Sequence, residues 1–85
     1  MNLYYISQTE NEEYDTFSDA VVAAETAIEA ANTHPSGNPE NWKRETDGSF
    51  SGTWVKTADS VSVKLIGTAV QGTPAGVICS SFHAG

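Results

Sequence analysis

Residues 17–32, FSDAVVAAETAIEAAN, form the densest apolar run of the chain and constrain its fold more than any other stretch. At helical spacing the apolar residues fall on one stripe, which predicts a single amphipathic helix that begins near Thr16. At a period of two they alternate between two faces instead, as in a strand that is covered on both sides. The two patterns predict different folds, and the residues around Thr26 favour one of them.

Thr26 and Glu29 have the spacing of a capping box, in which the threonine hydroxyl accepts the glutamate backbone N–H and the glutamate carboxylate reaches back. Such a cap would be wasted in the middle of a helix. We therefore expect a strand over residues 18–24, a tight turn, and a short helix over residues 27–33. The continuous helix stays open as the alternative. The helix ends before Pro35, whose ring disfavours helical backbone in the residue that precedes it.

Three further segments are expected to be strands because they alternate and are rich in aromatic and β-branched residues. They are residues 2–8 (NLYYISQ), 61–69 (VSVKLIGTA) and 77–82 (VICSSF). The acidic segment 9–16 follows the first of them. We expect it to be an ordered loop between two antiparallel strands, with a mobile acidic arm as the alternative.

A hairpin is expected between the helix and the last two strands. Residues 41–46 and 49–56 flank an Asp-Gly dipeptide at 47–48, which accommodates the positive φ angles of a type I′ turn. With a two-residue turn, Trp42 lies diagonally across from Trp54 and can touch it. This pair is a candidate for a second aromatic cluster.

The length and composition of the chain limit it to one small domain. It has 85 residues, of which 39% are hydrophobic. We expect a single α+β domain over residues 1–85, in which a mainly antiparallel sheet of about five strands carries one short helix packed on one face. No apolar run approaches the roughly 18 residues of a membrane span, and the first residues lack the basic region of a signal peptide. We therefore expect a protein that does not enter a membrane and stays in the cytoplasm, which agrees with the single cysteine.

The charge of the chain is concentrated in its first half. Eight acids and no Lys or Arg precede Lys43, which gives −8, whereas four bases and three acids from Lys43 onward give +1. This asymmetry opposes direct binding of nucleic acid and favours either a basic protein partner or solubility alone. The expected partner-binding residues are Glu10, Glu12, Glu13, Asp15, Asp19, Glu25 and Glu29.

The residues that carry metal or nucleophilic chemistry form no specific motif. Cys79, His34 and His83 are the soft metal ligands of the chain, and none is paired at a ligand spacing. The acids before Thr16 lack the loop glycine and terminal glutamate of an EF-hand. We expect no metal and no cofactor. Cys79 is expected to be a buried packing residue, with a nucleophile assisted by His83 as the rival.

Several segments carry a resemblance to a known family. They are LYYISQ, YDTFSDAVVAAE, HPSG, GTW and the C-terminal GVICSSFHAG. Together they resemble a family of short uncharacterised proteins of phages and prophage-bearing bacteria. The resemblance implies a phage setting, hence the cytoplasm of a host cell, and a strand followed by a helix in AVVAAETAIEA. It implies no activity and no catalytic residue.

Charge and resemblance together lead to a functional hypothesis. The composition of the acidic half resembles phage proteins that block host defence enzymes by occupying nucleic-acid sites, as anti-CRISPR proteins do. We expect a non-enzymatic interaction protein of phage type that inhibits a host or anti-phage defence protein. The first alternative is a small-ligand binder or minor enzyme that uses the Trp42 and Trp54 region with Cys79 or His83. The second is an accessory component of a larger assembly.

Overall fold

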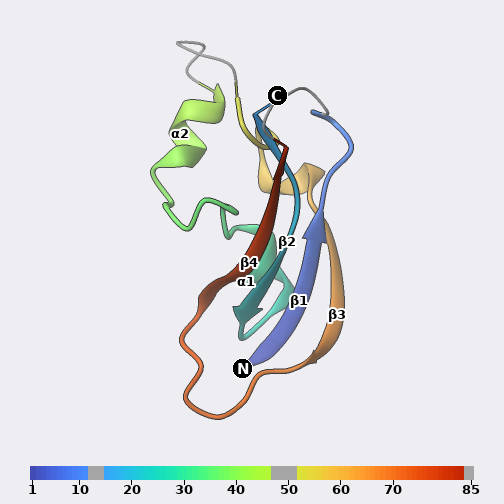
Figure 1. The fold of residues 1–85 in the computed structure, drawn as a ribbon, viewed down its shortest axis with the longest axis vertical. Coiled ribbons are helices and arrows are strands. Elements are labelled where there is room, and N and C mark those ends of the chain that lie inside the picture. Colours follow the sequence, from blue (N-terminus) through green and yellow to red (C-terminus); the bar gives the residue numbers. More distant parts are fainter. Residues whose placement is uncertain (12–14, 47–51, 84–85) are drawn as a thin grey trace.

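The computed structural model describes residues 1–11, 15–46 and 52–83, which contain an antiparallel sheet and short helices (Figure 1). The elements are β1 (Asn2–Ser7), β2 (Thr16–Ala24), α1 (Ala27–Ala31), α2 (Asn41–Thr46), a 3-10 turn (Ala58–Ser60), β3 (Ser62–Thr68) and β4 (Gly76–His83). The four strands lie in the order β3-β1-β2-β4 and every neighbouring pair is antiparallel. The α+β prediction is confirmed. The sheet has four strands where we expected about five.

The alternation of β1 and β2 builds one buried face of the sheet. Tyr4 lies opposite Val22 and Ile6 opposite Ala20, so these four residues share a face. All four are buried. Helix α1 packs against β1, β2 and β3, and contributes Ala30 to the core. Two further core residues, Trp54 and Val55, come from the chain before the 3-10 turn. The core therefore lies between the sheet, helix α1 and the segment that contains Trp54 and Val55.

The expected break between strand and helix is present at Thr26. Its backbone is extended (φ −138°, ψ 162°), and its Oγ1 accepts a hydrogen bond from the backbone N–H of Glu29 at 3.2 Å. The Glu29 carboxylate accepts the N–H of Glu25 at 3.1 Å, one residue before the cap. These two bonds start α1 immediately after β2 ends, so the strand-then-helix prediction is confirmed and the continuous helix is wrong.

The expected strand over residues 41–46 is wrong, because these residues form helix α2. The start signal lies just upstream, where the Asn38 side chain accepts the backbone N–H of Glu40 at 3.0 Å. Pro39 follows Asn38, and a side-chain cap followed by proline is a typical helix start. Residues 52–57 are not in a strand either. The expected turn at 47–48 and the start of its second strand, up to residue 51, lie outside the described residues.

Helix α2 also changes the expected aromatic pair. Trp54 is 1% exposed and belongs to the core, whereas Trp42 packs against the core from α2. The indole N–H of Trp42 donates to the backbone oxygen of Asn32 at 3.0 Å. Its ring meets the ring of His34 edge to face, with centroids 5.3 Å apart. The two tryptophans therefore do not form a cross-strand pair, because Trp42 is not in a strand.

Candidate functional site

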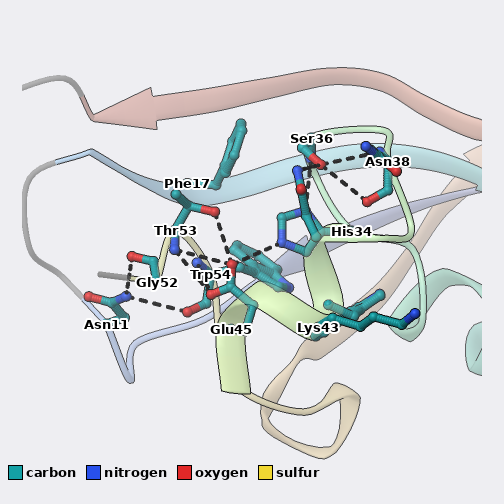
Figure 2. A network of polar contacts seen from close by, with 12 residues as sticks. Asn11, Phe17, His34, Ser36, Asn38, Lys43, Glu45, Gly52, Thr53 and Trp54 are labelled. Carbon is teal, nitrogen blue, oxygen red and sulfur yellow. Dashed lines mark hydrogen bonds and ion pairs between the residues drawn. The ribbon is translucent and has the colours of Figure 1, made fainter. Parts of the chain in front are cut away.

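A buried carboxylate joins α2 to the segment that follows it (Figure 2). Both oxygens of Glu45 accept the backbone N–H of Thr53, at 3.1 and 3.0 Å, and Oε2 also accepts the N–H of Trp54 at 3.0 Å. The hydroxyl of Thr53 donates to Oε1 at 3.0 Å. The same oxygen lies 3.2 Å from Nε2 of His34. Five contacts thus surround a carboxylate whose side chain is 1% exposed, so its charge is compensated inside the protein.

The neighbours of His34 determine its protonation. The backbone N–H of Ser36 donates to Nδ1 at 3.2 Å, so Nδ1 acts as an acceptor. The ring proton therefore belongs on Nε2, where it faces the Glu45 carboxylate. Burial lowers the pKa of His34 below its usual 6.5, although the hydrogen bond and charge of Glu45 act in the opposite direction. In a neutral imidazole of this form, Nδ1 accepts the N–H of Ser36 and Nε2 donates to Glu45, so both ring nitrogens have a hydrogen-bond partner.

Gly52 lies so close to this carboxylate that no larger residue fits without a shift. A Cβ atom at this position would lie 2.6 Å from Oε2 of Glu45. The Asn11 side chain donates to the backbone oxygens of Gly52 (3.2 Å) and Trp54 (3.3 Å), which holds this segment from the other side. Figure 2 shows the imidazole, the carboxylate and the Gly52–Trp54 backbone gathered at one point. The network fixes loops onto the sheet. The buried indole N–H of Trp54, beside this network, has no hydrogen-bond partner among the described residues.

The structure places the expected partner-binding acids in two groups. Glu10 and Asp15 lie in the loop between β1 and β2, and we call them the loop-end acids. Glu25 and Glu29 lie at the other end of β2, and we call them the helix-end acids. All four are exposed. The nine residues of β2 separate the groups by about 26 Å at the usual rise of a strand. They are two surfaces and not one patch.

The other expected acids differ from these four. Asp19 lies within β2, half-buried, on the side of the sheet opposite the core. The Tyr5 hydroxyl donates to its Oδ2 at 2.7 Å, and this bond raises the pKa of Tyr5 because an ionised tyrosine would lose it. Asp19 thus has a partner within the sheet. Glu12 and Glu13 lie outside the described residues.

The expectation of a buried Cys79 is wrong, because the residue is exposed. Its strand β4 is at the edge of the sheet, where one side has no neighbouring strand. The alternation that suggested a packing residue does not reveal which strand lies at an edge. His83 is four residues further along the same strand, and four residues of strand span about 13 Å. That separation is too long for an imidazole to activate the thiol.

Two hollows accompany these features. One of about 250 Å³ lies between the loop of residues 32–39 and the start of β4, and His34 is among the residues that line it. The other, of about 400 Å³, is polar and lies beside the buried network. It is lined by Glu10, Asn11, Glu45, Gly52, Trp54 and Lys56. Among the described residues, no group of three or more His, Cys, Asp and Glu side chains is placed to hold a metal ion.

Comparison of the chain with protein-family models, with curated proteins and with solved structures found no match. Within residues 1–11, 15–46 and 52–83, no helix has the length and apolar character needed to cross a membrane.

Sequence reasoning missed the partnership of His34 with Glu45. From the sequence alone, His34 is treated as a possible metal ligand and Glu45 is placed only within the expected strand over residues 41–46. The Asn-Pro pair at residues 38–39 was the available signal, because a helix that begins there shifts the register of Glu45. Nothing in the sequence pattern indicates that the two side chains meet, because 11 residues separate them.

Proposed function

We propose that the protein is a non-enzymatic interaction protein that binds a basic protein partner through its exposed carboxylates. The observation that carries this proposal is that the loop-end and helix-end acids are exposed, with one group at each end of β2. Among the described residues, none of these acids forms an ion pair with a lysine or a histidine. Carboxylates without a neighbouring cation attract a basic surface and accelerate its association.

The arrangement of the remaining polar groups supports binding in preference to catalysis. The imidazole and the carboxylate that lie in contact are buried and hold the fold. The exposed thiol and the second imidazole lie apart along β4. A nucleophile, its base and an orienting group need to lie within hydrogen-bond reach of one another. The described residues bring no such set together at the surface.

The spacing of the acids supports the finer proposal that the partner is a nucleic-acid-binding protein. The long axis of the molecule is 39 Å, which is comparable to about 34 Å for one turn of B-DNA. A groove that binds a nucleic-acid backbone presents Lys and Arg over such a length. Separated carboxylates can occupy that groove in place of phosphates. Together with the resemblance to phage proteins, this spacing supports the proposal that the protein inhibits a host or anti-phage defence enzyme, as anti-CRISPR proteins do.

Removing or reversing a charge at each end tests the proposal. We choose Asp15→Asn and Glu25→Lys because both side chains are exposed and neither has a hydrogen bond or ion pair within the described residues. Asparagine is used at position 15 because the φ of Asp15 is 62°, a backbone conformation that asparagine tolerates better than lysine. The partner is first isolated by affinity capture from lysate of a host bacterium, and binding is then measured by titration calorimetry at several salt concentrations. Each change should weaken binding by about tenfold and reduce its salt dependence, while the melting temperature stays nearly constant.

Glu40→Lys provides the matched control, because Glu40 is an exposed acid that belongs to neither the loop-end nor the helix-end acids. It should bind like the unchanged protein. If both end variants bind with unchanged affinity and salt dependence, the acids serve solubility and the proposal is wrong.

A further inference from the structure

Strand β4 has an open edge. In the order β3-β1-β2-β4 it pairs with β2 on one side and with no strand on the other. Each residue from Ile78 to His83 is exposed. The two large apolar side chains, Ile78 and Phe82, are 50% and 46% exposed. An edge of this kind is a template for another strand, because its outward backbone N–H and C=O groups lack partners from a neighbouring strand.

The two edges of the sheet are not equivalent. The β3 edge carries Lys64 near its middle, and a charged side chain discourages pairing with another strand. From Gly76 to Phe82 the β4 edge carries neither charge nor proline. Its ladder with β2 is regular over Cys79–Ser81, with register shifts on either side. An uncharged stretch with a regular ladder, Cys79–Ser81, therefore lies at the middle of β4, between two irregularities of the pairing.

We propose that this edge binds the same edge of a second copy of the chain, with the two β4 strands antiparallel about a two-fold axis at Ser80. This register sets Ile78 opposite Phe82 of the second copy, and the reverse pair repeats on the other side of the axis. The strand is self-complementary in this sense, since its two half-exposed apolar residues are equally far from Ser80. Cross-strand pairs of apolar residues stabilise such ladders.

The absence of charge along β4 permits a second copy as the occupant. A two-fold interface sets each group near its own equivalent, so like charges would meet wherever the interface is charged. The chain carries −7 overall, and most of its surface acids lie before Lys43. The residues 76–82 contribute none of that charge. Two copies can therefore approach along β4 without opposing carboxylates.

The dimer would continue the sheet through the two-fold axis and present two sets of acids on one particle. It does not depend on the proposed function, because the β4 edge and the loop-end and helix-end acids belong to different parts of the molecule.

Sedimentation equilibrium from low micromolar to near-millimolar concentration tests the proposal. The unchanged protein should show a monomer–dimer equilibrium. Ser80→Lys places two cations at the axis and should weaken the dimer by about tenfold or more. Ser62→Lys is the matched control, because Ser62 is an exposed serine on the opposite edge strand. It should dimerise like the unchanged protein.

Cross-linking between the Cys79 residues of the two copies tests the proposed register of the β4 strands. It would lie diagonally across the axis from its own equivalent, at about 7–8 Å, within reach of a short bismaleimide. Rapid covalent dimer formation is expected in the unchanged protein and in Ser62→Lys. Ser80→Lys should prevent it.

Amide hydrogen exchange tests the same pairing without a substitution, in case Ser80→Lys does not fold. Amides within β4 should exchange more slowly as the protein concentration rises, and amides of β3 should not. A protein that is monomeric at every concentration overturns the proposal. So does a dimer that Ser80→Lys leaves intact, or concentration-dependent protection confined to β3.

Discussion

Glu45 is a residue whose charge is stabilised by backbone geometry more than by an opposite charge. Its oxygens accept two backbone N–H groups and one hydroxyl, and its histidine neighbour is neutral in the arrangement described above. A buried carboxylate with several donors is stable, but removing one donor leaves part of the charge uncompensated. The residues that shape this cage should therefore be sensitive to small changes.

Gly52→Ala tests this sensitivity. The added Cβ would meet Oε2 of Glu45 at 2.6 Å, so either the carboxylate or the 52–54 backbone has to move. We expect the free energy of unfolding to fall by about 1–3 kcal/mol, as for a buried polar group that loses good geometry. Urea denaturation measures this difference.

Gly67→Ala is the control for that change, because a Cβ at Gly67 meets nothing within 4 Å. It lies in β3, where replacing glycine by alanine restricts the unfolded chain. Its free energy of unfolding should stay constant or rise. Equal losses in the two variants would contradict the packing argument at Gly52.

At the scale of elements, the junction of β2 and α1 depends on one hydroxyl. Thr26→Ala removes the acceptor of the Glu29 N–H and should lower the free energy of unfolding by about 1 kcal/mol. Thermal unfolding followed by circular dichroism measures it.

Thr57→Ala is its matched control. Thr57 occupies the same position before the 3-10 turn, with a similar extended backbone, but makes no side-chain cap bond. It should unfold almost like the unchanged protein. If Thr57→Ala lowers the free energy of unfolding as much as Thr26→Ala does, the loss comes from removing a threonine and not from removing a cap bond.

For the whole molecule, His34 links stability to pH. Its folded pKa is lowered below 6.5, whereas in the unfolded chain it is about 6.5. Below that pH the unfolded chain takes up a proton that the folded protein does not, so protonation favours unfolding. The free energy of unfolding should therefore be highest above about pH 6.5 and fall as the pH decreases toward the folded pKa. The slope approaches about 1.4 kcal/mol per pH unit.

Urea unfolding at about pH 7.5 and about pH 5.5 measures this loss, within the range that the unfolded pKa of histidine defines. His34→Gln should be less stable at the higher pH but should lose less on acidification. An identical pH dependence in His34→Gln would exclude His34 as the cause.

The sequence by itself determined the elements whose signals are local. The alternation in residues 2–8 and 18–24, and the spacing of Thr26 and Glu29, were sufficient because strands and caps depend on neighbours along the chain. The last two strands followed from the same alternation. The α+β class followed from their order.

Tertiary structure decided the rest. Residues 41–46 have strand and helix signals that compete, and helix α2 forms in a fold that packs Trp42 on the core and buries Glu45 against His34. Cys79 has the same alternation as a buried strand residue, but the order β3-β1-β2-β4 leaves it at an edge. The acids adjoin one another in sequence, yet an extended strand separates them in space. In each case, the deciding contacts join residues that are distant in the chain, and no local pattern records which distant partner a side chain meets.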